Sequence, residues 1–223
     1  GPSSSHTMGP MVAAARFLEM LRASPFDARG LRAALHGSLA FTGVGHATDR
    51  AVTLGLAGFT PEAYDAEAAE RTLAAIRADR ALTPPGLPRL AFDPQGDLVF
   101  DRGAPLPGHA NGLVLSATDA QGDTILSETF YSVGGGFVVT AAELAEGPAA
   151  APGPPVPHPF ATAAEMLAMA RESGCSIAQM KRANEVARHG VAGPEPGIAR
   201  IWQVMAGCMD RGLATDGTLP GGL

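Results

Sequence analysis

Apolar residues in the first 145 positions recur at helical intervals in three places. One helical face, just after a hydroxyl-rich start at residues 3–7, carries Met8, Met11, Val12, Ala15, Leu18 and Leu21. A second helix is predicted to begin near His46 and to stop at Gly58. A third is predicted to follow Pro61, because the fixed φ of proline suits a first helical turn.

Strand-like segments lie between and after these helices. A short strand over residues 31–36 is predicted to end in His36-Gly37-Ser38, and further strands are predicted over 97–101, 112–118 and 124–131. The last two flank residues 119–123, whose Asp and Gly content is typical of a hairpin turn. Together these elements predict an α+β first domain, a mixed sheet with helices, over residues 1–145.

A change of composition follows this domain. Residues 146–160 are rich in proline, alanine and glycine and carry almost no charge. Such a composition predicts a stiff, extended linker. Residues 161–223 show only helical patterns and predict the start of a second, all-α domain.

Helix signals are clear in this second part. Capping-box patterns stand at Thr162…Glu165 and Ser176…Gln179, and the glycines suited to helix ends are Gly174 and Gly190. A last helix is predicted to end at Gly212 and to carry one apolar stripe of Ile198, Ile201, Trp202, Met205 and Cys208. Three short helices bury such stripes poorly, so we expect further polypeptide to cover them and Cys208 to be a core residue.

Composition and charge narrow the function classes. Apolar residues make up 46% of the 223-residue chain, enough for a sizeable core. A net charge of −6 gives no electrostatic reason to hold nucleic acid or an anionic membrane. Two cysteines form no disulfide framework and no metal-site spacing, which fits a reducing, cytoplasmic location. No apolar run is long enough for a membrane helix.

The first candidate for chemistry is the segment Ser3, Ser4, Ser5, His6 and Thr7. Hydroxyl groups beside the free backbone N–H groups of a helix start suit a carboxylate or a phosphate. From composition alone, a serine-rich helix cap explains the segment equally well.

The second candidate is the stretch from Gly37 to Asp49, which contains His46. Gly43 and Gly45 allow close backbone approach or a positive φ. A helix N-terminus near His46 would disfavour the imidazolium and leave a neutral base. The stretch lacks the Gly-Lys-Ser/Thr ending of a phosphate-binding loop, and a plain turn with a capping histidine remains the alternative.

Two further segments combine polar residues or glycines with turn signals. His109 and Asn111 stand in His-Ala-Asn-Gly, where Asn-Gly also indicates an ordinary loop. Gly134, Gly135 and Gly136 lie between strand-like residues. Three glycines there indicate a bulge, a place where backbone meets ligand, or a flexible bend.

Five segments, in this order, resemble the single-chain bacterial L-serine dehydratases that use an iron–sulfur cluster. They are GPSSSHTMGPM at 1–11, HGSLAFTGVGHATDRA at 36–51, LPGHANGL at 106–113, YSVGGGFVV at 131–139 and IWQVMAGCMDRGLATDGTLPGGL at 201–223. The resemblance spans essentially the whole chain and is weakest at 60–105 and in the linker. It identifies residues 1–145 with the family's beta-type domain and residues 161–223 with the start of its alpha-type domain.

The resemblance implies a reaction and a cofactor. L-serine would be deaminated to pyruvate and ammonia by β-elimination. One iron of a [4Fe–4S] cluster would act as a Lewis acid on the serine hydroxyl, and no pyridoxal phosphate would be needed.

The resemblance also implies roles for individual residues. His46 matches the base that takes the Cα proton. The substrate-cradling motif matches Ser3, Ser4, Ser5, His6 and Thr7. Other site-facing positions match His109, Asn111, the backbone wall of Gly134, Gly135 and Gly136, and a second-domain loop at 218–222.

Some positions depart from the family pattern. Val44 stands where a lysine is common, and His36 where an aromatic residue is common. Cys175 and Cys208 do not match the three cluster cysteines, which the resemblance places beyond Leu223. The chain as given is therefore expected to bind no cluster and to show no turnover.

Two other functions stay open. The family's first domain also resembles an amino-acid-binding regulatory domain, so a regulatory module without catalytic activity is the main alternative. A structural partner subunit is the other, although the fused linker argues against it. The expected partner is L-serine, with no nucleic acid and no membrane; the oligomeric state stays open, a homodimer included.

Overall fold

The computed structural model describes residues 3–147, 154–190 and 194–217, which belong to two compact units. The first unit contains residues 3–147 and the second contains the described residues from 154 onward. The predicted boundary at 145 lies close to this division, whereas residues 154–160 of the predicted linker belong to the second unit. The domain assignment itself stays a prediction.

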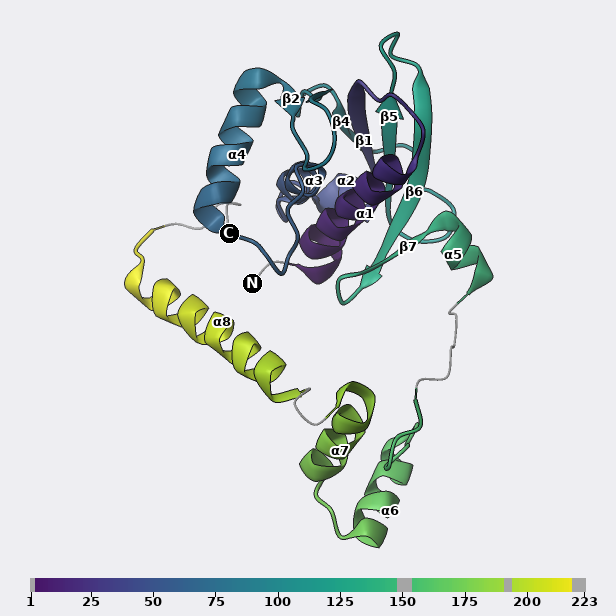
Figure 1. Cartoon of the computed structure of the whole chain (residues 1–223), viewed down its shortest axis with the longest axis vertical. Coiled ribbons are helices and arrows are strands. Elements are labelled where there is room, and N and C mark those ends of the chain that lie inside the picture. The colour runs from purple at the N-terminus through teal and green to yellow at the C-terminus, as the bar shows by residue number, and fades with distance from the viewer. Residues whose placement is uncertain (1–2, 148–153, 191–193, 218–223) are drawn as a thin grey trace. The chain divides into compact units, whose positions relative to one another are not determined.

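One mixed sheet forms the centre of the first unit (Figure 1). Its long strands are β1 (Gly30–Gly37), β5 (Asn111–Thr118) and β6 (Thr124–Gly134). Its short strands are β2 (Ala81–Leu82), β3 (Leu90–Ala91), β4 (Leu98–Asp101) and β7 (Phe137–Thr140). The order is β2-β3-β1-β5-β6-β7, and β4 also pairs with β1. β1 is parallel to β3 and β4 and antiparallel to β5.

Helices pack against this sheet and against one another. The N-terminal helix begins as a wide π turn, η1 (Ser4–Met8), and continues as α1 (Gly9–Ala23). The others in this unit are α2 (Ser38–Thr42), α3 (Thr48–Leu56), α4 (Ala66–Asp79) and α5 (Ala141–Glu146). α1 contacts the strands β5, β6 and β7 on one side and α3 on another. The structure is α+β, as the sequence predicts.

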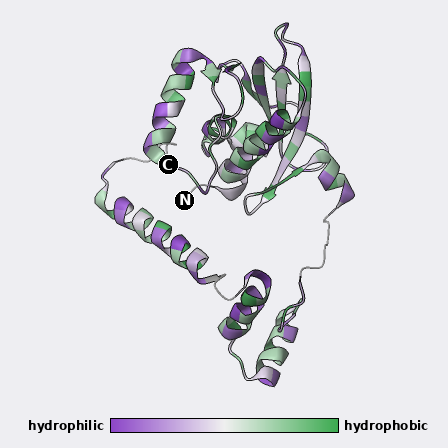
Figure 2. Cartoon of the chain, viewed as in Figure 1, coloured by the Kyte–Doolittle hydropathy of each residue, from purple (hydrophilic) through white to green (hydrophobic). Residues whose placement is uncertain are grey.

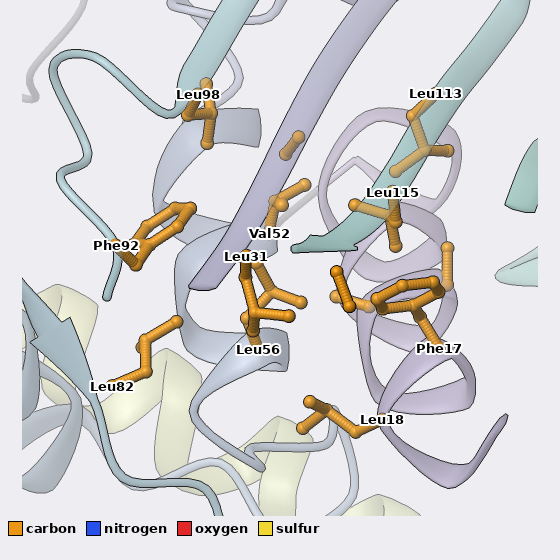
Figure 3. Close-up of a cluster of buried hydrophobic side chains, with 14 of the residues drawn as sticks. Phe17, Leu18, Leu31, Val52, Leu56, Leu82, Phe92, Leu98, Leu113 and Leu115 are labelled. Atoms are coloured by element: carbon orange, nitrogen blue, oxygen red, sulfur yellow. The ribbon is translucent and has the colours of Figure 1, made fainter. Parts of the chain in front are cut away.

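The core lies between the sheet, α1 and α3 (Figure 3). Phe17 of α1, Leu115 of β5 and Leu56 of α3 have no exposed surface. Alternate residues of β1 and β5 enter this core, as one face of a half-buried strand does. The packing fixes the position of the helix that carries the N-terminal hydroxyls.

The predicted start of the third helix needs correction, whereas the second helix begins near His46 as predicted. Pro61 lies in a turn, and α4 begins five residues later behind Asp65, whose side chain accepts a hydrogen bond from Ala68 N at 2.7 Å. The start of α4 is thus set by the capping side chain of Asp65. A proline such as Pro61 is compatible with a first helical turn but does not cap it. The second helix begins at Thr48 behind Ala47, two residues after His46. The strands predicted over 31–36, 97–101, 112–118 and 124–131 are confirmed within a few residues.

The described part of the second unit consists of α6 (Ala163–Ser173), α7 (Ile177–His189) and α8 (Pro194–Ala214). Both predicted capping boxes are present, with Thr162 bonded to Glu165 and Ser176 to Gln179. The predicted helix ends at Gly174 and Gly190 are also confirmed.

The apolar stripe of α8 is exposed. Hydrophobic and hydrophilic residues both appear along this helix (Figure 2), and Trp202 keeps 59% of its surface accessible. The prediction that Cys208 is a core residue is wrong for the described chain, since its side chain is exposed. The helix also runs through Gly212 to Ala214, because one glycine costs a helix only about 1 kcal/mol. Among the described residues, no helix is long and apolar enough to cross a membrane.

Replacing Gly37 with alanine should destabilise the first unit. Gly37 has φ +56°, and a Cβ atom there would lie 2.3 Å from the carbonyl oxygen of Ala110. Strain and steric overlap together should lower the free energy of unfolding by about 2 kcal/mol or more. Denaturant unfolding of the protein measures this change.

Gly96→Ala is the matched control, because a Cβ atom at Gly96 would meet no atom within 4 Å and its φ is not positive. The control should stay within about 0.5 kcal/mol of the parent. An equal loss of unfolding free energy in Gly37→Ala and Gly96→Ala would show that the backbone conformation of Gly37 is not the cause.

Candidate active site

The hydroxyl-rich segment forms the first turn of the N-terminal helix. Ser3 is the N-cap, and its hydroxyl accepts a hydrogen bond from His6 N at 3.3 Å. The carbonyl oxygen of Ser3 accepts from the N–H groups of both Thr7 and Met8, at 2.9 and 3.2 Å. This shared acceptor widens the turn, so the segment that the sequence places before the helix is itself helical.

The imidazole of His6 has a hydroxyl on each side. Its Nδ1 lies 2.9 Å from Ser5 Oγ, and its Nε2 lies 3.0 Å from Ser38 Oγ. Its backbone oxygen accepts a hydrogen bond from Thr48 Oγ1 at 2.6 Å. Residues from η1, α2 and α3 thus converge on His6.

His46 lies directly beside this group. It occupies the turn between α2 and α3, is exposed, and its backbone oxygen accepts a hydrogen bond from Thr7 Oγ1 at 2.8 Å. The ring centroids of His6 and His46 are 4.8 Å apart, with an interplanar angle of 49°. One small molecule can therefore touch the His46 ring and the N-terminal segment at the same time.

The backbone around His46 differs in detail from the sequence prediction. Ala47, and not Gly43 or Gly45, takes the positive φ, at +54°. Gly43 instead allows close approach, because a Cβ atom there would lie 2.1 Å from Leu39 O. His46 stands directly before Ala47, the N-cap of α3, so the predicted helix N-terminus does lie beside it.

Burial and the neighbouring imidazole both act on the charge of His6. The pKa of His6 is lowered below its usual value, first by burial of the ring and then by repulsion from His46. His6 therefore favours the neutral imidazole, which can donate one hydrogen bond and accept another.

The two polar residues of the 106–113 segment lie at the start of β5. Asn111 pairs with Gly37 across the β1–β5 ladder, one residue before Ser38. Its side-chain amide donates to Ser132 O at 3.1 Å, and its backbone N–H donates to His109 Nδ1 at 3.1 Å. These contacts hold the end of β1 against β5 and β6.

The three glycines form the turn between β6 and β7. Gly134, Gly135 and Gly136 all have positive φ, and the β6–β7 register shifts between Ser132 and Gly134. A Cβ atom at Gly134 or Gly136 would meet nothing within 4 Å. The glycines serve the backbone conformation, and the predicted bulge is present.

A cavity of about 340 Å³ has Thr7 and Ala47, next to the two histidines, among its lining residues. Its walls include Met8, Met11 and Leu54, so they are largely apolar. An apolar cavity does not suit a zwitterionic amino acid. The polar side of the site, around His6 and His46, suits one better.

Ser38 and Thr48 are contacts that the sequence did not single out. Both lie inside the quoted 36–51 motif, but nothing in their spacing links them to His6, 32 and 42 residues away. Residues 218–222, predicted to form a loop near the site, lie outside the described residues. The catalytic and binding roles of all these residues stay predictions.

No group of three potential metal ligands occurs among the described residues. Cys175 and Cys208 are both free thiols there. The described part of this chain does not supply a ligand set for an iron–sulfur cluster. Leu223, beyond which the resemblance places the cluster cysteines, itself lies outside the described residues, so that placement stays a prediction.

The fold and the paired histidines define an α+β domain with a polar site beside its N-terminal helix. The sequence profile described as serine dehydratase beta chain matches residues 1–143, and the chain belongs to this family. It is similar to the L-serine dehydratase of Streptomyces coelicolor, with 41% identity over the whole chain and half of that protein. It is also similar to L-serine dehydratase 1 of Escherichia coli K12, with 37% identity over the whole chain and 49% of that protein.

A further relative is the L-serine dehydratase of Mycobacterium bovis, 37% identical over the whole chain and 48% of that protein. The chain thus spans about half the length of the curated relatives it matches. The activity of this protein is therefore stated as a proposal.

His6 should make stability depend on pH. Its folded pKa lies below the unfolded value of 6.5, so in the window below pH 6.5 the unfolded state binds more protons. The free energy of unfolding should therefore rise with pH through that window and level off above pH 6.5. Thermal unfolding from pH 5 to 8 measures the slope, which His6→Asn should reduce.

The control is His189→Asn, at the exposed end of α7. It should keep the slope of the parent protein. A slope that survives in His6→Asn would show that other groups cause the dependence.

Proposed function

We propose that the full-length protein is an L-serine ammonia-lyase that converts L-serine to pyruvate and ammonia. The supporting observation is the 4.8 Å separation of the His6 and His46 rings beside a segment of three serines and a threonine. Membership of the serine dehydratase beta chain family and the names of the similar proteins point to the same substrate.

The chemistry demands a base and a fixed substrate. In the proposed β-elimination, His46 takes the Cα proton of serine, the electron pair forms the Cα–Cβ double bond, and the hydroxide leaves from Cβ. The aminoacrylate product then becomes an imine, which water hydrolyses to pyruvate and ammonia. The exposed ring of His46 gives an incoming serine direct access to the base.

The N-terminal turn is proposed to hold the substrate. Hydroxyl groups of Ser3, Ser4, Ser5 and Thr7, with His6, lie on the first turn of a helix that continues into α1. The hydroxyls of Ser3, Ser5 and Thr7 already have fixed hydrogen-bond partners, so their positions are set before a ligand arrives. Such a preorganised group suits the serine carboxylate.

The family resemblance implies that the full-length protein uses a [4Fe–4S] cluster and does not need pyridoxal phosphate. The cluster ligands are proposed from the same resemblance to lie beyond Leu223 in sequence. A cytoplasmic location is part of the same proposal. His109, Asn111 and the turn of Gly134, Gly135 and Gly136 are proposed to support the site through the β1–β5–β6 framework.

Replacing His46 with alanine in the full-length protein should abolish most turnover. Loss of a general base typically costs about 10² to 10⁴ in kcat. Pyruvate formation under anaerobic conditions measures kcat, and visible absorbance checks that any iron–sulfur cluster is retained.

His189→Ala on α7 is the matched control and should leave kcat within about twofold of the parent. Near-normal turnover in His46→Ala would reject His46 as the base. Serine binding without turnover in the parent protein, measured by calorimetry, would favour the regulatory module instead.

Replacing Ser5 with alanine should mainly raise the KM for serine. Loss of one hydrogen bond to a charged group is expected to raise KM about tenfold. Steady-state kinetics of the full-length variant checks this, with Ser24→Ala, at the far end of α1, as the control. A KM equal to that of the parent would remove Ser5 from the cradle.

A further inference from the structure

Ser38 occupies a sharply defined position at the corner between β1 and α2. Gly37 turns the chain with φ +56° and ψ −131°, and Ser38 begins α2 directly after it. The Ser38 N–H donates to Ala110 O at 2.8 Å, and the Ser38 carbonyl accepts from Thr42 Oγ1 at 2.8 Å. Both backbone groups of Ser38 are therefore fixed by the sheet and by its own helix.

The hydroxyl of Ser38 reaches a different element of the unit. Its Oγ lies 3.0 Å from Nε2 of His6, on the N-terminal helix. Ser5 stands at the opposite nitrogen, with its Oγ 2.9 Å from Nδ1. A hydroxyl at each nitrogen fixes the rotation of the ring and satisfies a neutral imidazole, which donates at one nitrogen and accepts at the other.

The second imidazole gives this arrangement a chemical consequence. His46 lies 4.8 Å from His6, centroid to centroid, and two cationic rings at that distance repel. His6 is the more buried ring and has both nitrogens engaged, whereas His46 is exposed. His46 is therefore the ring of the pair that remains accessible to a substrate.

We propose that Ser38 is a positioning residue of the elimination, which holds His6 as a neutral imidazole against His46 so that His46 is the ring that accepts the substrate proton. This inference rests on the proposed L-serine ammonia-lyase function. It assigns Ser38 no contact with the substrate. Its effect should therefore appear in kcat more than in KM.

The test compares three substitutions at position 38 in the full-length protein. Ser38→Ala removes the hydroxyl and should lower kcat about tenfold, the effect of one lost hydrogen bond, with KM within twofold of the parent. Ser38→Thr keeps the hydroxyl and should restore kcat to within about threefold. If Ser38→Ala fails to fold, the nearly isosteric Ser38→Cys, a weak hydrogen-bonding partner, takes its place.

Thr42→Ala is the matched control. Thr42 belongs to the same short helix and bonds the carbonyl of Ser38, not His6. This variant reports the effect of loosening α2 alone and should leave kcat within about twofold. If Thr42→Ala loses as much activity as Ser38→Ala, or if Ser38→Thr is as slow as Ser38→Ala, the proposal is overturned.

A second measurement does not depend on activity. Histidine labelled with ¹³C and ¹⁵N reports the tautomer of His6 by NMR, with the His6 signals assigned from the His6→Asn variant. The parent and Thr42→Ala should show one dominant neutral tautomer, and Ser38→Ala should show exchange between two. Unchanged His6 signals in Ser38→Ala would overturn the proposal. If the parent protein forms no pyruvate, the proposed function fails. The NMR comparison then still decides whether Ser38 fixes the tautomer of His6.

Discussion

The N-terminal turn, the β1–α2 corner and the start of α3 meet at His6, and the geometry of the site depends on that meeting. Ser38 at the β1–α2 corner contacts its ring, Thr48 at the start of α3 contacts its backbone, and Ser5 contacts its other nitrogen. Each partner belongs to an element that also packs in or beside the core. The packing of these elements therefore also positions the residues of the site.

Periodic elements of this fold could be predicted from the sequence, whereas its contacts could not. The strands β5 and β6 follow from alternating apolar residues on both sides of an Asp- and Gly-rich turn, and the capping boxes of α6 and α7 are local signals. The contact of Ser38 with His6 spans 32 residues and depends on the β1–β5 register, which brings Gly37 opposite Asn111. No local pattern encodes that register.

Two local features also escaped sequence reasoning, for different reasons. The π turn at Ser4–Met8 arises where Ser3 O accepts two N–H groups and Thr48 holds His6 O, and such contacts leave no trace in residue spacing. The start of α4 at Asp65 had a signal, a capping aspartate, but Pro61 offered a competing one. The residues proposed to carry the chemistry could be selected from the sequence, because His46 and the serines stand out by type, while their supporting contacts do not.

Ala47 holds the backbone next to His46 in a left-handed conformation, at φ +54°. For a residue with a Cβ atom this conformation is less favourable than for glycine by roughly 1 kcal/mol. The protein thus tolerates a small local loss of stability beside an exposed imidazole, and the Cβ atom of Ala47 restricts the backbone more than glycine would. The backbone beside His46 is for this reason held in a defined conformation, and this constraint exists before any substrate arrives.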